Sequence, residues 1–584
     1  MQTPENTSND TRPVYAREDV LAAATAYFQG DTLAASVWLS KYALRDAAGN
    51  LCERTPDDMH RRLAAEIARV ERRYANPLSA EEVYDLLRDF RFLVPQGSPM
   101  AGIGNPYQII SLSNCFVIGI EGSADSYGAI MKIDEEQVQL MKRRGGVGHD
   151  LSQLRPVGTP VRNSALRAAG ILPFMARYAN STREVAQNGR RGALMLTLSV
   201  EHPDAPAFVD AKLKPGRLTG ANISLRVTDA FMRAALHGGT FTLRFPVGAE
   251  KPLVAKEISA TELWKKIIHN AWQCAEPGIL FWDTVLRESV PDCYADLGFR
   301  TVSTNPCGEV PLCSYDSCRL LAINLLGYVQ NPYTAEARFD FALFERHGRL
   351  AQRILDDILD LELEKIETIL AKIHNDPEPE FVKSTERDLW IKIREKCIQG
   401  RRAGIGITGE GDLLAALGIC YGAPESLNFS ENLHRTLALA VYRGSVDLAR
   451  ERGAFPLYDR AREANNPFIQ RLGAADPALL QDMQQYGRRN IALLTIAPTG
   501  TTSLMTQTSS GLEPVFRIAY TRRRKVQPGD PGVRIAFTDE AGDAWEEHHI
   551  LHKPFQDWLE TRGVDPETIA NLPAEKLAAL IEQS

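Results

Sequence analysis

Residues 303–309 read Ser-Thr-Asn-Pro-Cys-Gly-Glu and place an amide, a thiol and a carboxylate within five positions. Proline and glycine inside the segment favour a turn-rich loop rather than a helix. In extended backbone alternate side chains point the same way, so we expect Asn305, Cys307 and Glu309 to share one face. The segment predicts either a small polar site built around a thiol or a loop whose polar residues are incidental.

The cysteines surrounding this segment indicate thiol chemistry rather than a structural framework. The chain has nine cysteines in 584 residues, too few and too scattered for a disulfide scaffold. Cys307, Cys313 and Cys318 lie close together, but their long spacing and the absence of a nearby histidine disfavour a zinc site, so no metal is expected. A neighbouring glutamate raises the pKa of a thiol, which argues against a thiolate nucleophile of the cysteine-protease kind.

Outward from this segment, the pattern predicts three regions. Residues 1–15 are polar and expected to be disordered, and residues 16–92 have the periodicity of a helical domain. From 93 to 584 short apolar runs alternate with helical stretches, which predicts an α/β catalytic domain. The stretch 350–374 repeats apolar residues at helical spacing and is expected to be scaffold.

Composition narrows the class of protein. Hydrophobic residues make up 44% and charged residues 24%, as in an ordinary folded enzyme. A net charge of −7 gives no basic excess for a nucleic-acid partner. The sequence shows neither an N-terminal apolar run nor an apolar stretch of bilayer length, so we expect a cytoplasmic protein without a membrane partner.

Two further segments have alternative interpretations. Residues 404–409 (GIGITG) fit GxGxxG, but a helical stretch precedes them where a dinucleotide site needs a strand, so a tight turn with closely approaching backbones is favoured. Residues 497–503 (APTGTTS) follow the apolar run IALLTI, which is how α/β proteins often present backbone N–H groups and hydroxyls to a phosphate. They lack the lysine of a Walker loop, which argues against an ATPase.

Seven segments, in order, resemble the large catalytic subunit of ribonucleotide reductases. They are SLSNCFV (111–117), RRGGVG (143–148), NGRRGALM (188–195), NPCGE (305–309), SCRLLAINL (317–325), RRAGIGITG (401–409) and APTGTTS (497–503). The last, followed by SSGLEPVF and YTRRR, is most similar to the adenosylcobalamin-dependent class II enzymes. The resemblance implies a ten-stranded α/β barrel of two five-stranded halves, with the 305–309 segment on a loop through its shielded centre.

The resemblance also implies residue roles. Cys307 would carry a thiyl radical, generated with adenosylcobalamin, that abstracts the ribose 3′ hydrogen of a ribonucleotide, expected to be a diphosphate. Glu309 would act as general base and Asn305 would hydrogen-bond the ribose hydroxyls. Cys115 and Cys318 would form the redox-active disulfide, and Cys313 would be structural.

Substrate and effector contacts follow from the same resemblance. Substrate-binding positions would be Ser98, Asn114, Cys115, Gly146, Asn305, Glu309, Pro498, Thr499, Gly500, Thr501 and Thr502. A deoxynucleoside triphosphate effector at the interface of a homodimer would contact Asp125, Arg155, Gln187, Asn188, Gly189, Arg190 and Arg191. Where related proteins often have an acidic residue, this chain has Gly122 preceded by Glu121.

The resemblance extends to partners and to the chain end. A thioredoxin-type reductant is expected. Family members continue past the position of Ser584 with the last barrel strands and a cysteine-bearing tail, so a second polypeptide or a truncated product is expected. The alternatives are a class I-type large subunit, a nicotinamide or flavin oxidoreductase, and a non-catalytic regulatory paralogue.

Overall fold

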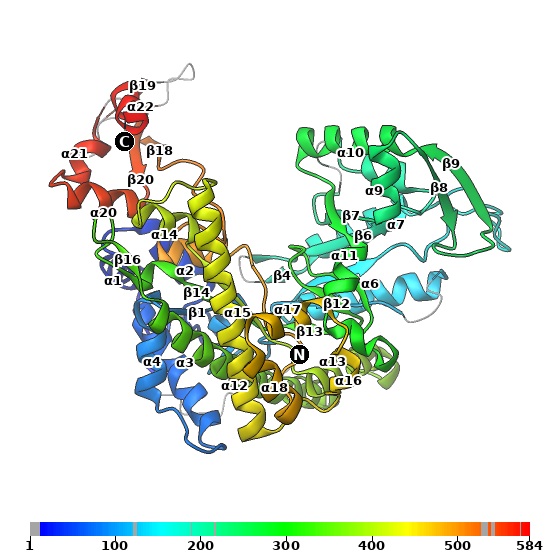
Figure 1. Cartoon of the computed structure of the whole chain (residues 1–584), viewed down its shortest axis with the longest axis horizontal. Coiled ribbons are helices and arrows are strands. Elements are labelled where there is room, and N and C mark those ends of the chain that lie inside the picture. Colours follow the sequence, from blue (N-terminus) through cyan, green and yellow to red (C-terminus); the bar gives the residue numbers. More distant parts are fainter. Residues whose placement is uncertain are drawn as a thin grey trace.

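The N-terminal part of the chain is helical. The computed structural model describes residues 12–120, 125–187, 190–214, 216, 218–526, 535, 537–538, 544–572 and 574–583. The expected disordered segment lies outside these residues up to position 11, and from there Tyr15 donates a backbone hydrogen bond of 3.0 Å to Leu51. The helices that follow are α1 (Arg17–Tyr27), α2 (Thr32–Lys41), α3 (Pro56–Glu71) and α4 (Ala80–Leu87). They confirm the predicted helical region, which lies on one side of the molecule (Figure 1).

A six-stranded sheet forms the other side. Its order is β10-β7-β6-β3-β2-β13, in which the first five strands are parallel and β13 runs antiparallel to β2. The strands are β2 (Cys115–Val117), β3 (Gly146–Asp150), β6 (Leu194–Ser199), β7 (Asn222–Val227), β10 (Gly278–Phe281) and β13 (Ser317–Cys318).

Side chains along β2 point alternately to the two faces of this sheet, and the two faces pack against different parts of the protein. Phe116 packs in an apolar core with helices, whereas Cys115 and Val117 point to the opposite face, where they join Val310 and Leu312. The helices around this sheet are α6 (Tyr127–Met141), α7 (Leu172–Glu184), α9 (Asp229–Leu236), α10 (Ala260–Cys274) and α13 (Glu380–Gly400). The cysteine of β2 is thus on the face turned away from the helices.

A second sheet joins the first through a nearly continuous strand. Strand β14 (Leu320–Asn324) follows β13 after one residue and pairs antiparallel with β1 (Leu93–Pro95) and parallel with β17 (Gly404–Thr408). Leu494 extends this arrangement by a parallel bridge to Ile405. The stretch 317–324 therefore contributes one strand to each sheet and connects the two sheets directly.

The α/β prediction is confirmed, although the two sheets reach six and three strands in the described residues rather than the expected ten. The GIGITG segment is also corrected in detail: residues 404–408 form the buried strand β17, and the turn is confined to Gly409, whose φ is +82°. The expected close backbone approach is present, because a Cβ at Gly406 would lie 2.1 Å from the carbonyl oxygen of Thr495.

Long helices cover the second sheet. The predicted scaffold helix is α12 (Phe341–Asn375), and it packs against α3 and against α15 (Pro424–Arg452). Its N-cap Asp340 accepts a hydrogen bond of 2.9 Å from the backbone N–H of Leu343.

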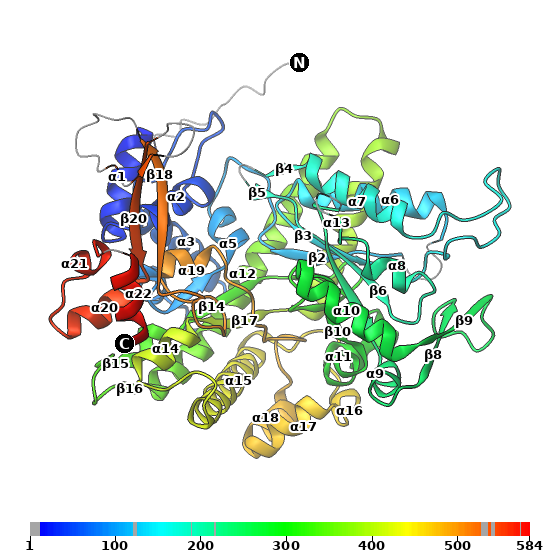
Figure 2. The same ribbon diagram turned by 90° about the horizontal axis from the view of Figure 1, so that it is seen from above.

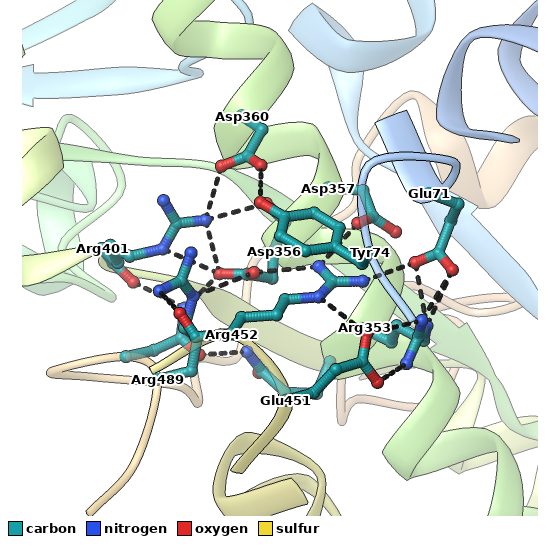
Figure 3. Close-up of polar contacts among 12 residues, drawn as sticks. Glu71, Tyr74, Arg353, Asp356, Asp357, Asp360, Arg401, Glu451, Arg452 and Arg489 are labelled. Carbon is teal, nitrogen blue, oxygen red and sulfur yellow. Dashed lines mark hydrogen bonds and ion pairs between the residues drawn. The ribbon is translucent and has the colours of Figure 1, made fainter. Parts of the chain in front are cut away.

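Buried ion pairs join these helices (Figure 3). The Arg452 side chain is fully buried and contacts Glu71 of α3 together with Asp356 and Asp357 of α12. Arg401, which directly follows α13, pairs with Asp356 and Asp360. The network therefore fixes the N-terminal helical region and the start of the β17 segment to the same scaffold.

The last described residues form a small layer beside α1 and α2 (Figure 2). It consists of β18 (Ala519–Val526), β19 (Phe537–Thr538), β20 (Ala544–Leu551), α20 (Lys553–Thr561), α21 (Pro566–Ala570) and α22 (Ala574–Gln583). Within the part of the chain that is described, no helix has both the length and the apolar character needed to cross a bilayer.

Candidate active site

The 303–309 segment connects two strands that lie across the face of the six-stranded sheet. Strand β11 (Thr301–Thr304) pairs antiparallel with β12 (Pro311–Cys313). A Cβ at Gly148 of β3 would lie 1.9 Å from the carbonyl oxygen of Thr304, so only glycine allows this approach. Asn222 of β7 donates a hydrogen bond of 2.9 Å to the carbonyl oxygen of Pro306.

The same loop is also held from the side of the second sheet. Thr495, whose backbone passes Gly406 of β17, donates a hydrogen bond of 3.3 Å to the carbonyl oxygen of Glu309. The loop is therefore held from both sheets, as the expected path through the barrel requires.

The loop turns between Asn305 and Gly308, which corrects the expectation of an extended segment with one shared face. Gly308 has a φ of +89° and donates a backbone hydrogen bond of 3.0 Å to the carbonyl oxygen of Asn305. Asn305 is fully buried, and its Oδ1 accepts a hydrogen bond of 2.9 Å from the N–H of Val310. The turn, rather than strand alternation, brings the side chains of Asn305 and Glu309 together.

Cys307 lies at the tip of this turn and is exposed. The shielded thiol expected for a barrel centre is therefore not found in this structure. The physical reason is the turn itself, which leaves Cys307 exposed at its tip while the preceding Pro306 is buried. Pro306 packs back toward the sheet: a Cβ at Gly146 would lie 2.9 Å from its Cγ and 3.3 Å from Sγ of Cys115.

Cys115 and Cys318 are paired directly opposite each other in the antiparallel ladder between β2 and β13. Opposite residues in such a ladder have Cα atoms about 4.5–5.5 Å apart, which lies within the range that a disulfide spans. Both residues are buried in one small apolar cluster with Val310 and Ala497. The fold thus brings two cysteines about two hundred positions apart close enough for a disulfide to join them.

Three of the predicted substrate-binding residues are connected by hydrogen bonds near the starts of β2 and β3. Asn114 accepts a bond of 2.8 Å from the N–H of Ser98 and donates its own N–H to the carbonyl of Cys318 at 2.9 Å. The N–H of Gly146 donates to the carbonyl of Asn114 at 2.9 Å. Ser98, Asn114, Gly146 and the cysteine pair therefore form one continuous group.

Four buried polar atoms of the predicted residues have no hydrogen-bond partner within the described part of the structure. They are Oγ of Ser98, Nδ2 of Asn114, Nδ2 of Asn305 and Oε2 of Glu309. Buried polar atoms in folded proteins are nearly always hydrogen-bonded, so a group of four indicates a site for a polar ligand. Burial raises the pKa of Glu309, and the nearby Asn305 amide offsets part of this rise.

The 497–503 segment is positioned by the helical region as well as by the barrel. Thr499 adopts a left-handed φ of +46°, and its hydroxyl bonds with Thr408 at 3.1 Å. The hydroxyl of Thr501 bonds with Tyr42 at 2.6 Å, and that of Thr502 donates to Gln96 at 2.8 Å. Pro498 and Gly500 are exposed. Sequence reasoning missed Tyr42 and Gln96, although Gln96 could have been suspected because it lies two positions before Ser98.

The expected effector residues fall into two groups. The side chain of Arg155 pairs with Asp125, and the backbone N–H of Arg155 donates to the same carboxylate at 2.9 Å. Gln187 ends strand β4 (Ala186–Gln187), and Arg190 and Arg191 form strand β5 (Arg190–Arg191), its antiparallel partner. Glu121, Gly122, Asn188 and Gly189 lie outside the described residues.

The structure is thus a mixed α/β protein in which a cysteine-bearing turn is held between two joined sheets, beside two cysteines paired across a ladder. Residues 113–569 match the ribonucleotide reductase barrel domain and residues 28–105 match the ribonucleotide reductase all-alpha domain. The chain belongs to the ribonucleotide reductase large-subunit family.

Among its relatives are cobalamin-dependent enzymes. The chain is 34% identical over 495 residues to the vitamin B12-dependent ribonucleoside-diphosphate reductase of Mycobacterium tuberculosis (strain CDC 1551 / Oshkosh), covering 84% of this chain and 62% of that protein. It is 30% identical over 444 residues to the protein of the same name from Thermoplasma acidophilum, covering 76% and 50%.

A relative without B12 in its name is less similar. The ribonucleoside-diphosphate reductase subunit alpha of Chlamydia pneumoniae is 24% identical over 492 residues, covering 75% of this chain and 43% of that protein. The chain thus spans less than two thirds of the length of each of these three relatives.

Proposed function

We propose that this chain reduces ribonucleotides, in the form of diphosphates, to 2′-deoxyribonucleotides by thiyl-radical chemistry with adenosylcobalamin. The observation that carries the proposal is the group of four unpartnered buried polar atoms beside the Cys307 turn. A ribose with adjacent hydroxyls, placed at this group, would supply donors and acceptors to all four.

The chain's own residues account for each chemical step. The thiyl form of Cys307 takes the hydrogen atom from the ribose 3′ carbon, and Glu309 accepts the proton of the 3′-hydroxyl. The raised pKa of Glu309 suits a general base, since a carboxylate with a raised pKa binds a proton more strongly. The 2′-hydroxyl leaves as water. Cys115 and Cys318 supply the two electrons and two protons that form this water and fill the 2′ carbon, and they end as a disulfide. Cys307 then returns the hydrogen atom to the 3′ carbon and is again a thiyl radical.

The exposed turn fits a radical source that approaches from outside the chain. Adenosylcobalamin, when bound, supplies the organic radical that converts the Cys307 thiol to a thiyl radical. The printed names of the M. tuberculosis and T. acidophilum relatives support this cofactor.

Regulation and assembly are part of the proposal. The Asp125–Arg155 pair and the β4–β5 hairpin would take a deoxynucleoside triphosphate effector, and a thioredoxin-type protein would serve as reductant. A groove of about 830 Å³ between α6 and α7 is the face that we assign to a homodimer contact; its lining is mostly polar and charged and includes the apolar Met131, Val138 and Pro173. Light scattering with Met131→Lys, a substitution in this groove, tests the dimer: loss of the dimer is expected.

The test of the activity is formation of deoxynucleoside diphosphate by the purified chain with adenosylcobalamin and dithiothreitol. Turnover is expected with adenosylcobalamin and not with hydroxocobalamin, which has no adenosyl group to give a radical. Activity that instead required a separate metal-containing subunit would favour the class I-type alternative. Binding of a nicotinamide or flavin cofactor, seen in the absorption spectrum, would favour the other oxidoreductase.

A further inference from the structure

The two residues of the Cys115–Cys318 pair are both buried but differ in exposure. Cys115 is 7% exposed, whereas Cys318 is 0% exposed. Thiol–disulfide exchange requires a thiolate to reach one sulfur while the other sulfur departs. The difference in burial therefore selects Cys115 as the sulfur that an incoming thiolate can attack.

Arg402 lies beside the sulfur that must depart. Strands β14 and β17 pair in parallel with Leu320 opposite Gly404, so Cys318 and Arg402 each lie two residues before this pair. Cys318 is close enough to act electrostatically on the Arg402 guanidinium. The side chain of Arg319 confirms the proximity of these backbones by donating a hydrogen bond of 2.6 Å to the carbonyl of Arg402.

The guanidinium of Arg402 keeps one nitrogen available. Its side chain is 4% exposed, and its Nε donates to Asp316 at 2.6 Å. Its Nη2 is buried and has no hydrogen-bond partner within the described residues. A buried cationic N–H without a partner is costly, so this group is suited to a negative charge that forms during the reaction.

Cys313 does not compete for this role. Its Sγ lies 3.8 Å from Oδ2 of Asp316 and donates to it, so the thiol keeps its proton. Burial and then Asp316 raise the pKa of Cys313 well above its ordinary value. The negative charge that Arg402 would meet is therefore the charge on the departing sulfur of Cys318.

We propose that re-reduction of the disulfide has a fixed direction: the reductant attacks Cys115, and Cys318 leaves as a thiolate stabilised by Arg402. This inference rests on the proposed function, in which the two cysteines end each turnover as a disulfide. A thiolate of a dithiol reductant forms a bond to Sγ of Cys115 as the S–S bond breaks. The second thiolate of the dithiol then displaces Cys115. The dithiol becomes a disulfide, and its two electrons and two protons end on Cys115 and Cys318.

The direction can be read from the full-length chain without nucleotide or cobalamin. The chain is oxidised, treated briefly with glutathione, quenched with acid and alkylated, and its peptides are analysed by mass spectrometry. We expect glutathione on Cys115 and the alkyl group on Cys318, in at least tenfold excess over the reverse. Glutathione mainly on Cys318 would overturn the direction and leave the pairing intact. Failure of the Cys115–Cys318 disulfide to form would overturn the pairing, and with it this part of the proposed function.

The role of Arg402 is tested by the rate at which dithiothreitol reduces the oxidised chain. Arg402→Met should slow reduction about tenfold, and Arg402→Lys, which keeps a positive charge, should restore most of the rate. Because Arg402→Met leaves Asp316 buried and unpaired, the double variant Arg402→Met with Asp316→Asn provides a charge-matched control, and it should be equally slow. An unchanged rate in the folded double variant would show that Arg402 only stabilises the fold.

Discussion

Thr502 donates a hydrogen bond of 2.8 Å from its hydroxyl to Oε1 of Gln96, a residue 406 positions earlier in the chain. This bond joins the 498–502 loop to the segment that carries Ser98, so the two predicted substrate-binding segments have one fixed spacing. Thr502→Val removes the hydroxyl at nearly constant volume. We expect KM for the nucleotide to rise about tenfold, a loss of roughly 1.4 kcal/mol of binding, with a smaller change in kcat.

Thr502→Ser is the matched control for this experiment, because it keeps the hydroxyl and removes only a methyl group. Its KM should stay close to that of the unchanged chain. A normal KM in Thr502→Val would show that the bond to Gln96 does not position the nucleotide.

Cys307→Ser should abolish turnover and leave the fold unchanged. The side chain is exposed at the tip of its turn, so its effect on the free energy of unfolding should stay within about 0.5 kcal/mol. An oxygen-centred radical is much harder to form than a thiyl radical, so no product is expected. Cys115→Ser and Cys318→Ser should allow hydrogen abstraction, measured by isotope exchange at the 3′ position, but block repeated turnover. Retained turnover in Cys307→Ser would remove that residue from the mechanism.

Glu309→Gln should inactivate the chain without destabilising it. Because burial raises the folded-state pKa of Glu309, ionisation of this carboxyl at neutral pH costs stability, and that cost disappears below its ordinary pKa, where it is protonated in both states. The variant should therefore melt at the same or a higher temperature than the unchanged chain at pH 7, and the difference should shrink as the pH falls toward 4. A lower melting temperature at pH 7 would mean that Glu309 has a structural role.

Arg452→Met should strongly destabilise the chain, by about 3–5 kcal/mol, because it leaves buried carboxylates without their cation. Arg452 contacts Glu71, Asp356 and Asp357 with no exposure of its side chain. Chemical denaturation measures the change. Arg450→Met on the same helix is the control, since the Arg450 side chain is 40% exposed and should contribute little. Equal losses in both variants would argue against a special role for the buried network.

The same network predicts acid sensitivity. Burial alone would raise the pKa of Asp356, but Arg401, Arg489 and Arg452 outweigh it and lower the pKa to about 2, below the ordinary value of 3.8. The stabilisation from this carboxylate is therefore present above pH 4 and is lost as the pH falls toward 2. As the pH falls from 4 to 2, the melting temperature of the unchanged chain should fall more steeply than that of the Arg452→Met variant.

Gly406→Ala should prevent correct folding, because the added Cβ would lie 2.1 Å from the carbonyl oxygen of Thr495. Both atoms belong to packed backbone, so neither can move far. Gly128→Ala on α6, where the nearest atom would be 3.7 Å away, is the matched control and should be harmless. The yield of folded chain and its melting temperature measure the difference, and equal values for the two variants would contradict the close packing of β17.

Local sequence pattern was enough to predict the helical region, the α/β alternation and the scaffold helix α12. The GIGITG segment shows where it was not enough, because its buried strand is created by pairing with β14 and by the passage of Thr495 over Gly406. Those partners lie far away in sequence and leave no local sign. Pattern reasoning therefore recognised that small residues were needed and misjudged the local shape as a turn.

At the site, sequence predicted the residue types and not their arrangement. The shared face of Asn305 and Cys307 assumed an extended backbone, whereas Gly308 with its positive φ folds the segment into a turn and exposes the thiol. Tyr42 and Arg402 were missed for a different reason. Each acts through a residue hundreds or tens of positions distant, and no spacing rule within one segment reveals such a contact.

In the proposed reaction, the position of Cys115 opposite Cys318 would also link the catalytic cycle to the stability of the protein. A disulfide between them closes a loop of about two hundred residues, which on the chain-entropy account stabilises the folded state by roughly 5 kcal/mol. The oxidised chain is then the harder form to unfold, and each reduction would lower the free energy of unfolding again. Thermal inactivation and proteolysis would accordingly fall mainly on chains that are reduced and ready to react.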